Sequence, residues 1–476
     1  MFRYMKYVLF SKGTVAVIAA IGIVFVMAAQ PASAIEITFR SFSGAAAIGP
    51  PADDFAAKLA SITATTLGKK ETVTFTKISP RPAVPKEFKK DIVAAVGTGG
   101  PLAGGKGFDA AYISGSTLNK AWGFIYNSGV PFGPNFDEFL GFLYGKNIDN
   151  GRETGLDFLQ SVFDKRKRNI VAIPIVGSPH QGSGYFMKPV GDAGSIPGIG
   201  LKGLCQEKWT FRYLPPAQYV LDRACDNLVK DGVIRKKNIA FVTAVAGGKI
   251  VEEINAGNVQ AFEFATPLDD MSVLFKKPEI NPGIVKARYL HFPGWHQPFL
   301  VTYLIINKQV WNKLSEPQKT LVMSVARDHV GSSYGEILRQ QGGKLQEILN
   351  ANTKDKDESN DIVLVRWPDK DLTLLKDATI QFLNDRAKDK SLKKEDRADY
   401  KKILNAFREY VRANNDYWKV RPARGRCCST GRNELLLVIP FIPGSDYQSK
   451  MAQVQGGIIV NNKHTTRRKE APYEQF

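Results

Sequence analysis

Apolar and polar residues alternate through the first half of the chain in a succession of strand-like and helix-like segments. Residues 35–42 have the period of two of a half-buried strand, and residues 51–67 have the period of a helix. Further strands are predicted at 72–78, 108–113 and 170–175, with a helix at 88–96. Strands that alternate with helices predict a parallel sheet covered by helices.

A second set of strands follows, and the C-terminal third is helical. The strands are predicted near 209–213, 239–242, 259–264 and 287–291. Ser315-Glu316-Pro317-Gln318 has the sequence of a capping box with a proline in the first helical turn, and periodic apolar residues continue to about Leu349, interrupted by Gly342-Gly343. Helices at 371–386 and 394–414 come next. We expect the long helix to brace two lobes.

The first 34 residues have the pattern of a secretory signal peptide. Basic residues are followed by an apolar run at 14–29 and by Ala32-Ser33-Ala34, a small-x-small cleavage site. We therefore expect export and cleavage after Ala34. The alternative, a permanent anchor, needs about 18 or more apolar residues. No cysteine precedes Cys205, which excludes a lipoprotein signal.

The residues from Arg421 to the end differ in character from the helical region before them. They contain many basic residues, the pair Cys427-Cys428 and a short apolar run at 435–442. We expect residues 421–476 to form a poorly ordered tail. Pairing of the apolar run with a sheet edge, or a shifted reading frame, are alternatives.

The formal net charge of +19 does not indicate a nucleic-acid-binding protein. Basic residues are interleaved with acidic ones at 369–376 and 385–408 instead of forming one stripe, and the signal peptide predicts export.

Cys205 and Cys225 either form a disulfide, which would stabilise the fold by up to about 3 kcal/mol for a loop of this length, or stay reduced and buried. Neither cysteine pair has the spacing of a metal site.

Two glycine-rich segments resemble nucleotide-binding motifs without their context. The segment 100–106 has the glycine and lysine spacing of a P-loop, but Gly107 follows where a hydroxyl should bind magnesium, and a strand follows where a helix should. The glycines at 198, 200 and 203 likewise precede a strand. The sequence contains no Gly-x-Ser-x-Gly elbow between a strand and a helix and no His-Glu-x-x-His motif, and its five histidines are scattered, so enzyme chemistry has little support.

Three segments carry residues suited to a small polar ligand. Arg212 lies among aromatic residues, and its guanidinium has the planar fork that binds a carboxylate; the alternative is a surface arginine on an edge strand. Glu263 lies in an apolar strand without an oppositely charged sequence neighbour, so its burial requires a positive partner. Trp295, His296 and Gln297 come together at one turn after Pro293-Gly294.

In these residues the chain resembles the solute receptors of the tripartite ATP-independent periplasmic (TRAP) transporters. Val130-Pro131-Phe132-Gly133, the following segment that ends in Phe142-Leu143-Tyr144-Gly145, and Gly182-Ser183-Gly184-Tyr185-Phe186 match that family in order and spacing. Arg212 stands where the family has its carboxylate-binding arginine. The resemblance extends from about Ile37 to Trp418.

The resemblance implies a set of site residues. In the branch that binds 2-oxo acids, the side chains at Gln181 and Glu263 and the backbone carbonyl at Phe264 hold a cation such as sodium or calcium. An ion pair with a nearby Lys or Arg is the alternative for Glu263. Phe264 replaces the tryptophan that is usual there, and Gln297 replaces a frequent glutamate. The other expected ligand-binding residues are Tyr112, Phe132, Tyr185 and Trp295.

The resemblance also implies the fold and the function. The fold is α/β, a two-lobe periplasmic binding protein with hinge-crossing strands and a long C-terminal bracing helix. We expect lobe I at 35–176 and 297–339, and lobe II at 177–296 and 340–420. The expected function is a periplasmic receptor, without a cofactor, that delivers a small carboxylate to TRAP permease subunits. A sensor for a signalling partner is the alternative, with a periplasmic enzyme behind it.

Overall fold

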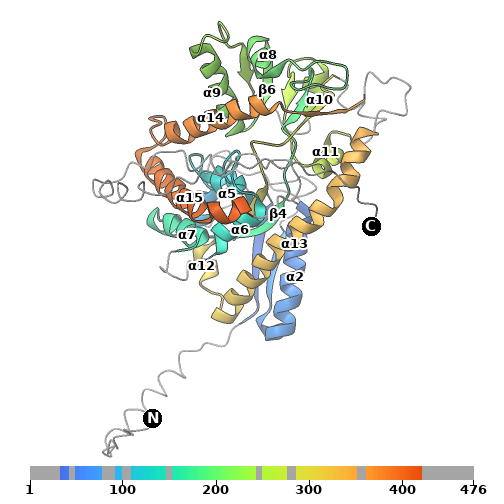
Figure 1. Cartoon of the computed structure of the whole chain (residues 1–476). Coiled ribbons are helices and arrows are strands. Elements are labelled where there is room, and N and C mark those ends of the chain that lie inside the picture. Colours follow the sequence, from blue (N-terminus) through green and yellow to red (C-terminus); the bar gives the residue numbers. More distant parts are fainter. Residues whose placement is uncertain are drawn as a thin grey trace, which may run out of the picture. The chain divides into compact units, whose positions relative to one another are not determined.

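The computed structural model describes the main part of the chain (Figure 1). The described residues are 33–41, 49–77, 92–98, 109–145, 153–242, 249–275, 286–350 and 361–420. Contacts divide the chain into Met1–Leu437 and Val438–Phe476, and every described residue belongs to the first unit. The predicted signal peptide up to Ala32, the P-loop-like segment and the tail lie outside the described residues.

The first sheet has the strand order β2-β1-β3-β10-β4. Its strands are β1 (Ile35–Ser41), β2 (Val73–Lys77), β3 (Ala110–Ser114), β4 (Ile170–Ser178) and β10 (Leu300–Asn307). The first three are parallel, but β10 runs antiparallel to both β3 and β4, so the expectation of an all-parallel sheet is wrong. We did not predict β10 because it is apolar and buried on both faces, which removes the alternation of a half-buried strand.

Helices before and after the strands cover this sheet. They are α2 (Gly49–Leu67), α4 (Ile92–Gly97), α5 (Gly123–Ser128), α6 (Phe136–Tyr144), α7 (Gly155–Lys165) and α12 (Lys308–Trp311). Phe39, Phe55 and Ile173 are among the side chains of the core that α2 closes over the sheet. Two short 3-10 turns, Lys69–Glu71 and Gly115–Thr117, complete this part.

The second sheet has the order β11-β9-β5-β8-β6-β7 and is also mixed. Its strands are β5 (Gly184–Phe186), β6 (Trp209–Arg212), β7 (Ile239–Phe241), β8 (Ala261–Phe262), β9 (Tyr289–Phe292) and β11 (Val363–Arg366). The helices of this half are α8 (Gly200–Gln206), α9 (Ala217–Lys230), α10 (Ile250–Asn255), α11 (Pro267–Val273) and α14 (Asp369–Arg386). We did not predict β5 and β11, which have three and four residues.

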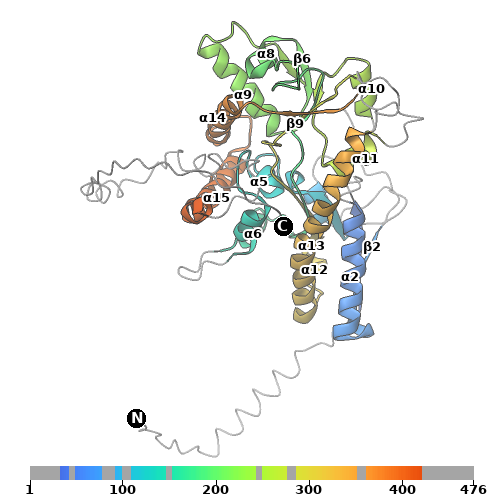
Figure 2. The same ribbon diagram turned by 45° about the vertical axis from the view of Figure 1, so that its right-hand side comes forward.

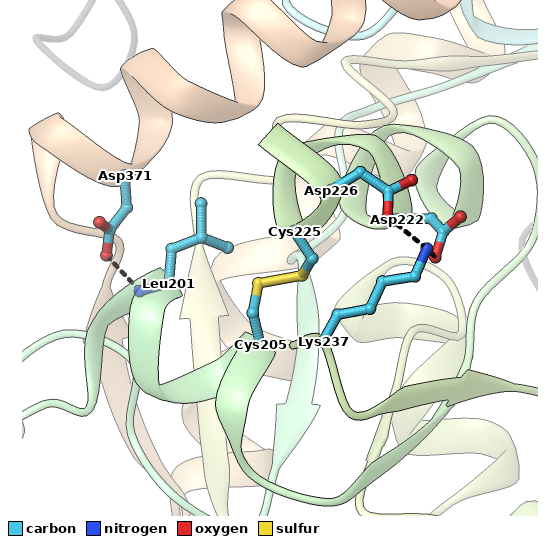
Figure 3. The surroundings of a disulfide bond; sticks show 7 residues. All are labelled: Leu201, Cys205, Asp222, Cys225, Asp226, Lys237 and Asp371. Atoms are coloured by element: carbon cyan, nitrogen blue, oxygen red, sulfur yellow. Dashed lines mark hydrogen bonds and ion pairs between the residues drawn. A yellow bond between two sulfur atoms is a disulfide. The ribbon is translucent and has the colours of Figure 1, made fainter. Parts of the chain in front are cut away.

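A disulfide joins two helices of the second half (Figure 3). Cys205 at the end of α8 is bonded to Cys225 in α9, which decides between the two states that the sequence left open. Beside it, Lys237 forms ion pairs of 2.7 Å with both Asp222 and Asp226 of α9. These bonds fix α9 to the segments on either side of it.

The helix α13 (Glu316–Leu349) is one long helix that extends from α12 to α11 (Figure 2), and its side chains belong to the cores of both halves. The predicted capping box at Ser315 is present, and the helix runs without a break through Gly342-Gly343. Ile337 belongs to the core under the first sheet, whereas Ile348 belongs to the core under the second sheet. One continuous helix therefore connects the two halves, as expected of a bracing helix.

The last described helix, α15 (Lys394–Val420), packs against α6 and α7. Phe407 contacts Phe142 edge to face at 5.1 Å, and Arg166, directly after α7, forms a 2.6 Å ion pair with Asp399. These contacts attach α15 to helices of the first half, although the sequence grouped it with lobe II. The residue ranges of the lobes stay a prediction. Within the described residues, no helix combines the length and the apolar character needed to cross a membrane.

Candidate functional site

The candidate site is built from segments that lie far apart in the sequence. Arg212 is the last residue of β6, and Glu263 directly follows β8. These strands are parallel neighbours with Arg212 opposite Phe262, which brings the two charged side chains together. Gln181 lies between β4 and β5, and residues 295–297 lie between β9 and β10. Ends of strands from both sheets therefore supply the site.

Arg212 and Glu263 form a buried ion pair. The Arg212 Nη1 atom lies 3.1 Å from Glu263 Oε1 and donates to the Glu263 backbone carbonyl at 2.8 Å. Only 10% of the Arg212 side chain and 3% of the Glu263 side chain are exposed. The backbone N–H of Leu214 also donates to Oε1, at 3.2 Å. The ion pair that we named as the alternative for Glu263 is therefore present, because Arg212 is adjacent in space though not in sequence.

The burial of Glu263 raises the pKa of its carboxyl above the ordinary value. The charge of Arg212 and the hydrogen bonds from Leu214 and Gln181 act in the opposite direction. Since burial outweighs these contacts, the single arginine compensates the carboxylate incompletely, and additional positive charge near Glu263 would stabilise its ionised form.

Gln181 connects the ion pair to the turn at residues 295–297. Its Nε2 atom lies 2.8 Å from Nε2 of His296 and 3.4 Å from both Glu263 Oε2 and Gln297 Oε1. The structure thus brings together Gln181, Glu263 and Arg212, which we selected as site residues, with His296 and Gln297.

Aromatic side chains enclose this polar cluster. Trp295 stacks on Phe132 with ring centroids 5.7 Å apart, and the Phe132 N–H donates to the Trp295 carbonyl at 2.9 Å. Phe132 has a φ of 57°, an uncommon conformation for a residue other than glycine. Tyr213 stacks on His296 at 5.9 Å. Phe132 precedes α6 and Trp295 precedes β10, so this stack links loops from different halves.

Three nitrogens of the cluster are buried without a hydrogen-bond partner among the described residues. They are Arg212 Nε, Trp295 Nε1 and His296 Nδ1. Buried polar groups in folded proteins nearly always have partners, so each unpaired nitrogen requires a water or a ligand. Arg and Trp nitrogens only donate, so the missing partner must offer acceptor oxygens.

Tyr112, Tyr185 and Phe264 have other surroundings. The Tyr112 hydroxyl lies 2.6 Å from Thr302 Oγ1, and the Tyr185 hydroxyl donates to Asp270 at 3.0 Å. Burial raises the pKa of both tyrosines above the ordinary value, so neither ionises near neutral pH. Phe264 packs partly buried against the core under the second sheet. The hydroxyls of both tyrosines are thus already engaged within the protein.

The expected cation ligands are all oxygens. Among the described residues, no three His, Cys, Asp or Glu side chains converge as a metal cluster. The expected cation ligands, namely Gln181, Glu263 and the Phe264 carbonyl, do not form a cluster of that type, because Glu263 is the only acidic residue among them. Gln181 Oε1 accepts no hydrogen bond from the described residues, and Glu263 Oε2 accepts only the long one from Gln181. These oxygens fit a hard cation that completes its coordination with water or ligand.

The sequence did not reveal the roles of His296 and Tyr213. His296 directly follows Trp295 and Tyr213 directly follows Arg212, but nothing in the sequence shows that His296 contacts Gln181 or that the two rings stack. The signal that points to them is their position directly beside selected residues.

Comparisons with known proteins show which proteins this chain resembles. No family model matches the chain. A monocarboxylate 2-oxoacid-binding periplasmic protein of Nostoc sp. is 19% identical over 237 residues, which are 50% of this chain and 54% of that protein. The chain thus matches about half the length of this curated relative.

Solved structures match over a larger part of the chain. A TRAP periplasmic solute-binding protein from Colwellia psychrerythraea, with bound calcium and pyruvate, has a TM-score of 0.58 at 16% identity and covers 81% of this chain and 97% of its own. One from Bordetella bronchiseptica, with calcium and picolinate, has a TM-score of 0.58 at 15% identity over 82% of this chain and 95% of its own. One from Pseudoalteromonas atlantica, with sodium and pyruvate, has a TM-score of 0.57 at 14% identity over 81% of this chain and 96% of its own.

Proposed function

We propose that this protein, which has the fold of the TRAP periplasmic solute-binding proteins, is a periplasmic receptor for a small carboxylate. In this proposal a 2-oxo acid or a related organic acid binds between the two lobes, and the protein delivers it to a TRAP permease. The Nostoc relative is a 2-oxoacid-binding periplasmic protein, and two of the solved relatives hold pyruvate.

The observation that carries the proposal is the incomplete hydrogen bonding of the Arg212 guanidinium. Its Nη1 atom is used by Glu263, while its Nε atom is buried and has no partner among the described residues. The Nε and Nη2 edge of a guanidinium matches the two oxygens of a carboxylate with parallel hydrogen bonds. The carboxylate of a bound organic acid would satisfy Nε, and the oxygens of the same molecule would supply the acceptors that the Trp295 and His296 nitrogens lack.

A cation fits the same site in this proposal. Gln181 Oε1, Glu263 and the Phe264 carbonyl would hold sodium or calcium beside the ligand carboxylate. Such a cation supplies positive charge to Glu263, whose pKa is raised by burial, and to the ligand. Phe264 in place of tryptophan changes the wall of the site and leaves the carbonyl ligand unaffected.

Closure of the lobes on the ligand would give the permease its signal. Arg212 and Glu263 come from strands of the second sheet, whereas Phe132 precedes α6 in the first half and reaches the site through Trp295. Ligand that contacts both groups stabilises the closed arrangement. A sensor role with a signalling partner uses the same closure, and a neighbouring permease or sensor-kinase gene distinguishes the two.

The test is mass spectrometry of small molecules released from the purified protein, followed by calorimetry with pyruvate. We expect a small acid that binds and is recovered unchanged. Chemical conversion of the acid would favour an enzyme.

The mass of protein purified from a periplasmic extract tests cleavage after Ala34, which would leave Ile35 as the first residue.

A further inference from the structure

His296 is buried at the centre of the site, and the resemblance to known receptors assigned it no role. It lies in the loop between β9 and β10 and is 3% exposed. Its ring lies between Tyr213, stacked at 5.9 Å, and Trp295, edge to face at 5.4 Å. These rings hold the imidazole in one orientation, as a ligand-contacting group requires.

The contact with Gln181 determines which nitrogen of His296 carries the proton. Gln181 Nε2 is an amide nitrogen and can only donate, so His296 Nε2, at 2.8 Å, must accept. An imidazole that accepts at Nε2 can be neutral only with its proton on Nδ1. The contact also requires a neutral ring, because a protonated imidazole donates from both nitrogens and cannot accept at Nε2.

A second buried histidine shows what a satisfied ring of this kind looks like. His291 Nε2 accepts from the backbone N–H of Val190 at 2.9 Å, and its Nδ1 lies 2.9 Å from the Tyr289 carbonyl. His291 thus has the same tautomer with both nitrogens paired. In His296 the Nδ1–H has no partner among the described residues, although the atom is buried. The difference indicates that a partner from outside the protein completes His296.

Resting on the function proposed above, we infer that His296 determines specificity by donating its Nδ1–H to a second oxygen of the bound acid, at the 2-oxo or 2-hydroxy position. Arg212 Nε would then take the carboxylate. A neutral Nδ1–H bonds to a carbonyl or hydroxyl oxygen, but it repels the hydrogens of a 2-ammonium group. The site would accordingly favour 2-oxo acids over the unsubstituted acid and exclude 2-amino acids.

Two substitutions separate the nitrogens of the ring. The amide nitrogen of asparagine occupies roughly the position of Nδ1, so His296→Asn keeps a donor toward the ligand and loses the contact with Gln181. The amide of glutamine reaches the position of Nε2, so His296→Gln keeps a group beside Gln181 and loses the donor. Each variant is thus the matched control for the other.

The experiment measures the affinities of the native protein and both variants for pyruvate, propionate and L-alanine by calorimetry. We expect the native protein to prefer pyruvate to propionate by about tenfold or more and to bind L-alanine least. His296→Gln should reduce this preference to within about threefold while the affinity for propionate stays unchanged, and His296→Asn should retain most of it. A full preference in folded His296→Gln overturns the inference.

Nitrogen-15 NMR of the native histidines gives a reading that needs no variant to fold. We expect the proton of His296 on Nδ1, and a downfield shift of that proton when pyruvate, but not propionate, is added. A proton on Nε2, or an equal response to both acids, overturns the inference while pyruvate binding itself upholds the proposed function. If the native protein binds none of the acids tested, the proposed function fails and the inference fails with it.

Discussion

Substitution of Arg212 separates its structural contact from its proposed ligand contact. In Arg212→Lys the ammonium can still reach Glu263, whose Oε1 lies 3.1 Å from Nη1 in the native protein, so the buried carboxylate keeps a positive partner. The planar edge with Nε is lost. We therefore expect stability to change little and ligand affinity to fall by about 1.5 to 3 kcal/mol, the range for a hydrogen bond to a charged group.

Arg212→Ala, unlike Arg212→Lys, should lower the stability of the protein as well as its ligand affinity. It leaves Glu263 buried without a cation from the protein, which typically costs about 3 to 5 kcal/mol of stability. A second substitution, Glu263→Gln, should recover much of that loss because the remaining amide carries no charge, but it should not recover binding. The double variant is thus the control that distinguishes unfolding from loss of the ligand contact.

The assay is denaturant unfolding for stability and calorimetry with the acid identified by mass spectrometry for affinity. A folded Arg212→Lys variant that binds that acid within threefold of the native affinity refutes the reasoning. If Arg212→Ala is as stable as the native protein, the ion pair does not carry the burial of Glu263.

Four further predictions follow from other contacts. Burial raises the pKa of Asp270 in the folded protein. The stability of the native protein relative to Asp270→Asn should therefore fall as the pH rises from 4 toward the folded-state pKa, by at most about 1.4 kcal/mol per pH unit. Denaturant unfolding curves at several pH values measure this difference in stability, and a difference that does not change with pH contradicts the prediction. Replacing Cys205 and Cys225 by serine should lower stability by about 3 kcal/mol, as expected for a disulfide with a separation of 20 residues, with ligand affinity kept; an unchanged melting temperature would contradict this. Phe132→Ala removes the ring stacked on Trp295 and should weaken the decrease in radius of gyration on ligand binding that we expect from X-ray scattering, whereas Phe163→Leu, in the core beside Trp122, should not. Removal of sodium and calcium should lower ligand affinity in the native protein but have little effect in Glu263→Gln; equal affinities with and without the ions would exclude the cation.

The sequence determined those parts of the protein whose signals are local. The capping box at Ser315 specifies the start of α13 through hydrogen bonds within four residues, and the alternation of Ile35 to Ser41 specifies β1 through one buried face. The sequence also identified Gln181, Arg212 and Glu263 as site candidates, and the structure brings these three side chains together. Whether they bind the ligand stays a prediction.

Only the tertiary structure decided the pairings between distant segments. Arg212 and Glu263 are 51 residues apart and meet because β6 and β8 are neighbours in one sheet, a choice that no local pattern records. The strand β10 was missed because burial on both faces removes its period, and the bond between Cys205 and Cys225 depends on how α8 and α9 pack. The proton position of His296 likewise depends on the fold. Gln181 donates to Nε2 of His296 only in the folded protein, and this contact places the proton on Nδ1, which has no partner among the described residues. Local sequence determines helices, caps and exposed strands, whereas the partner of a buried charge is determined by strand order in the folded chain.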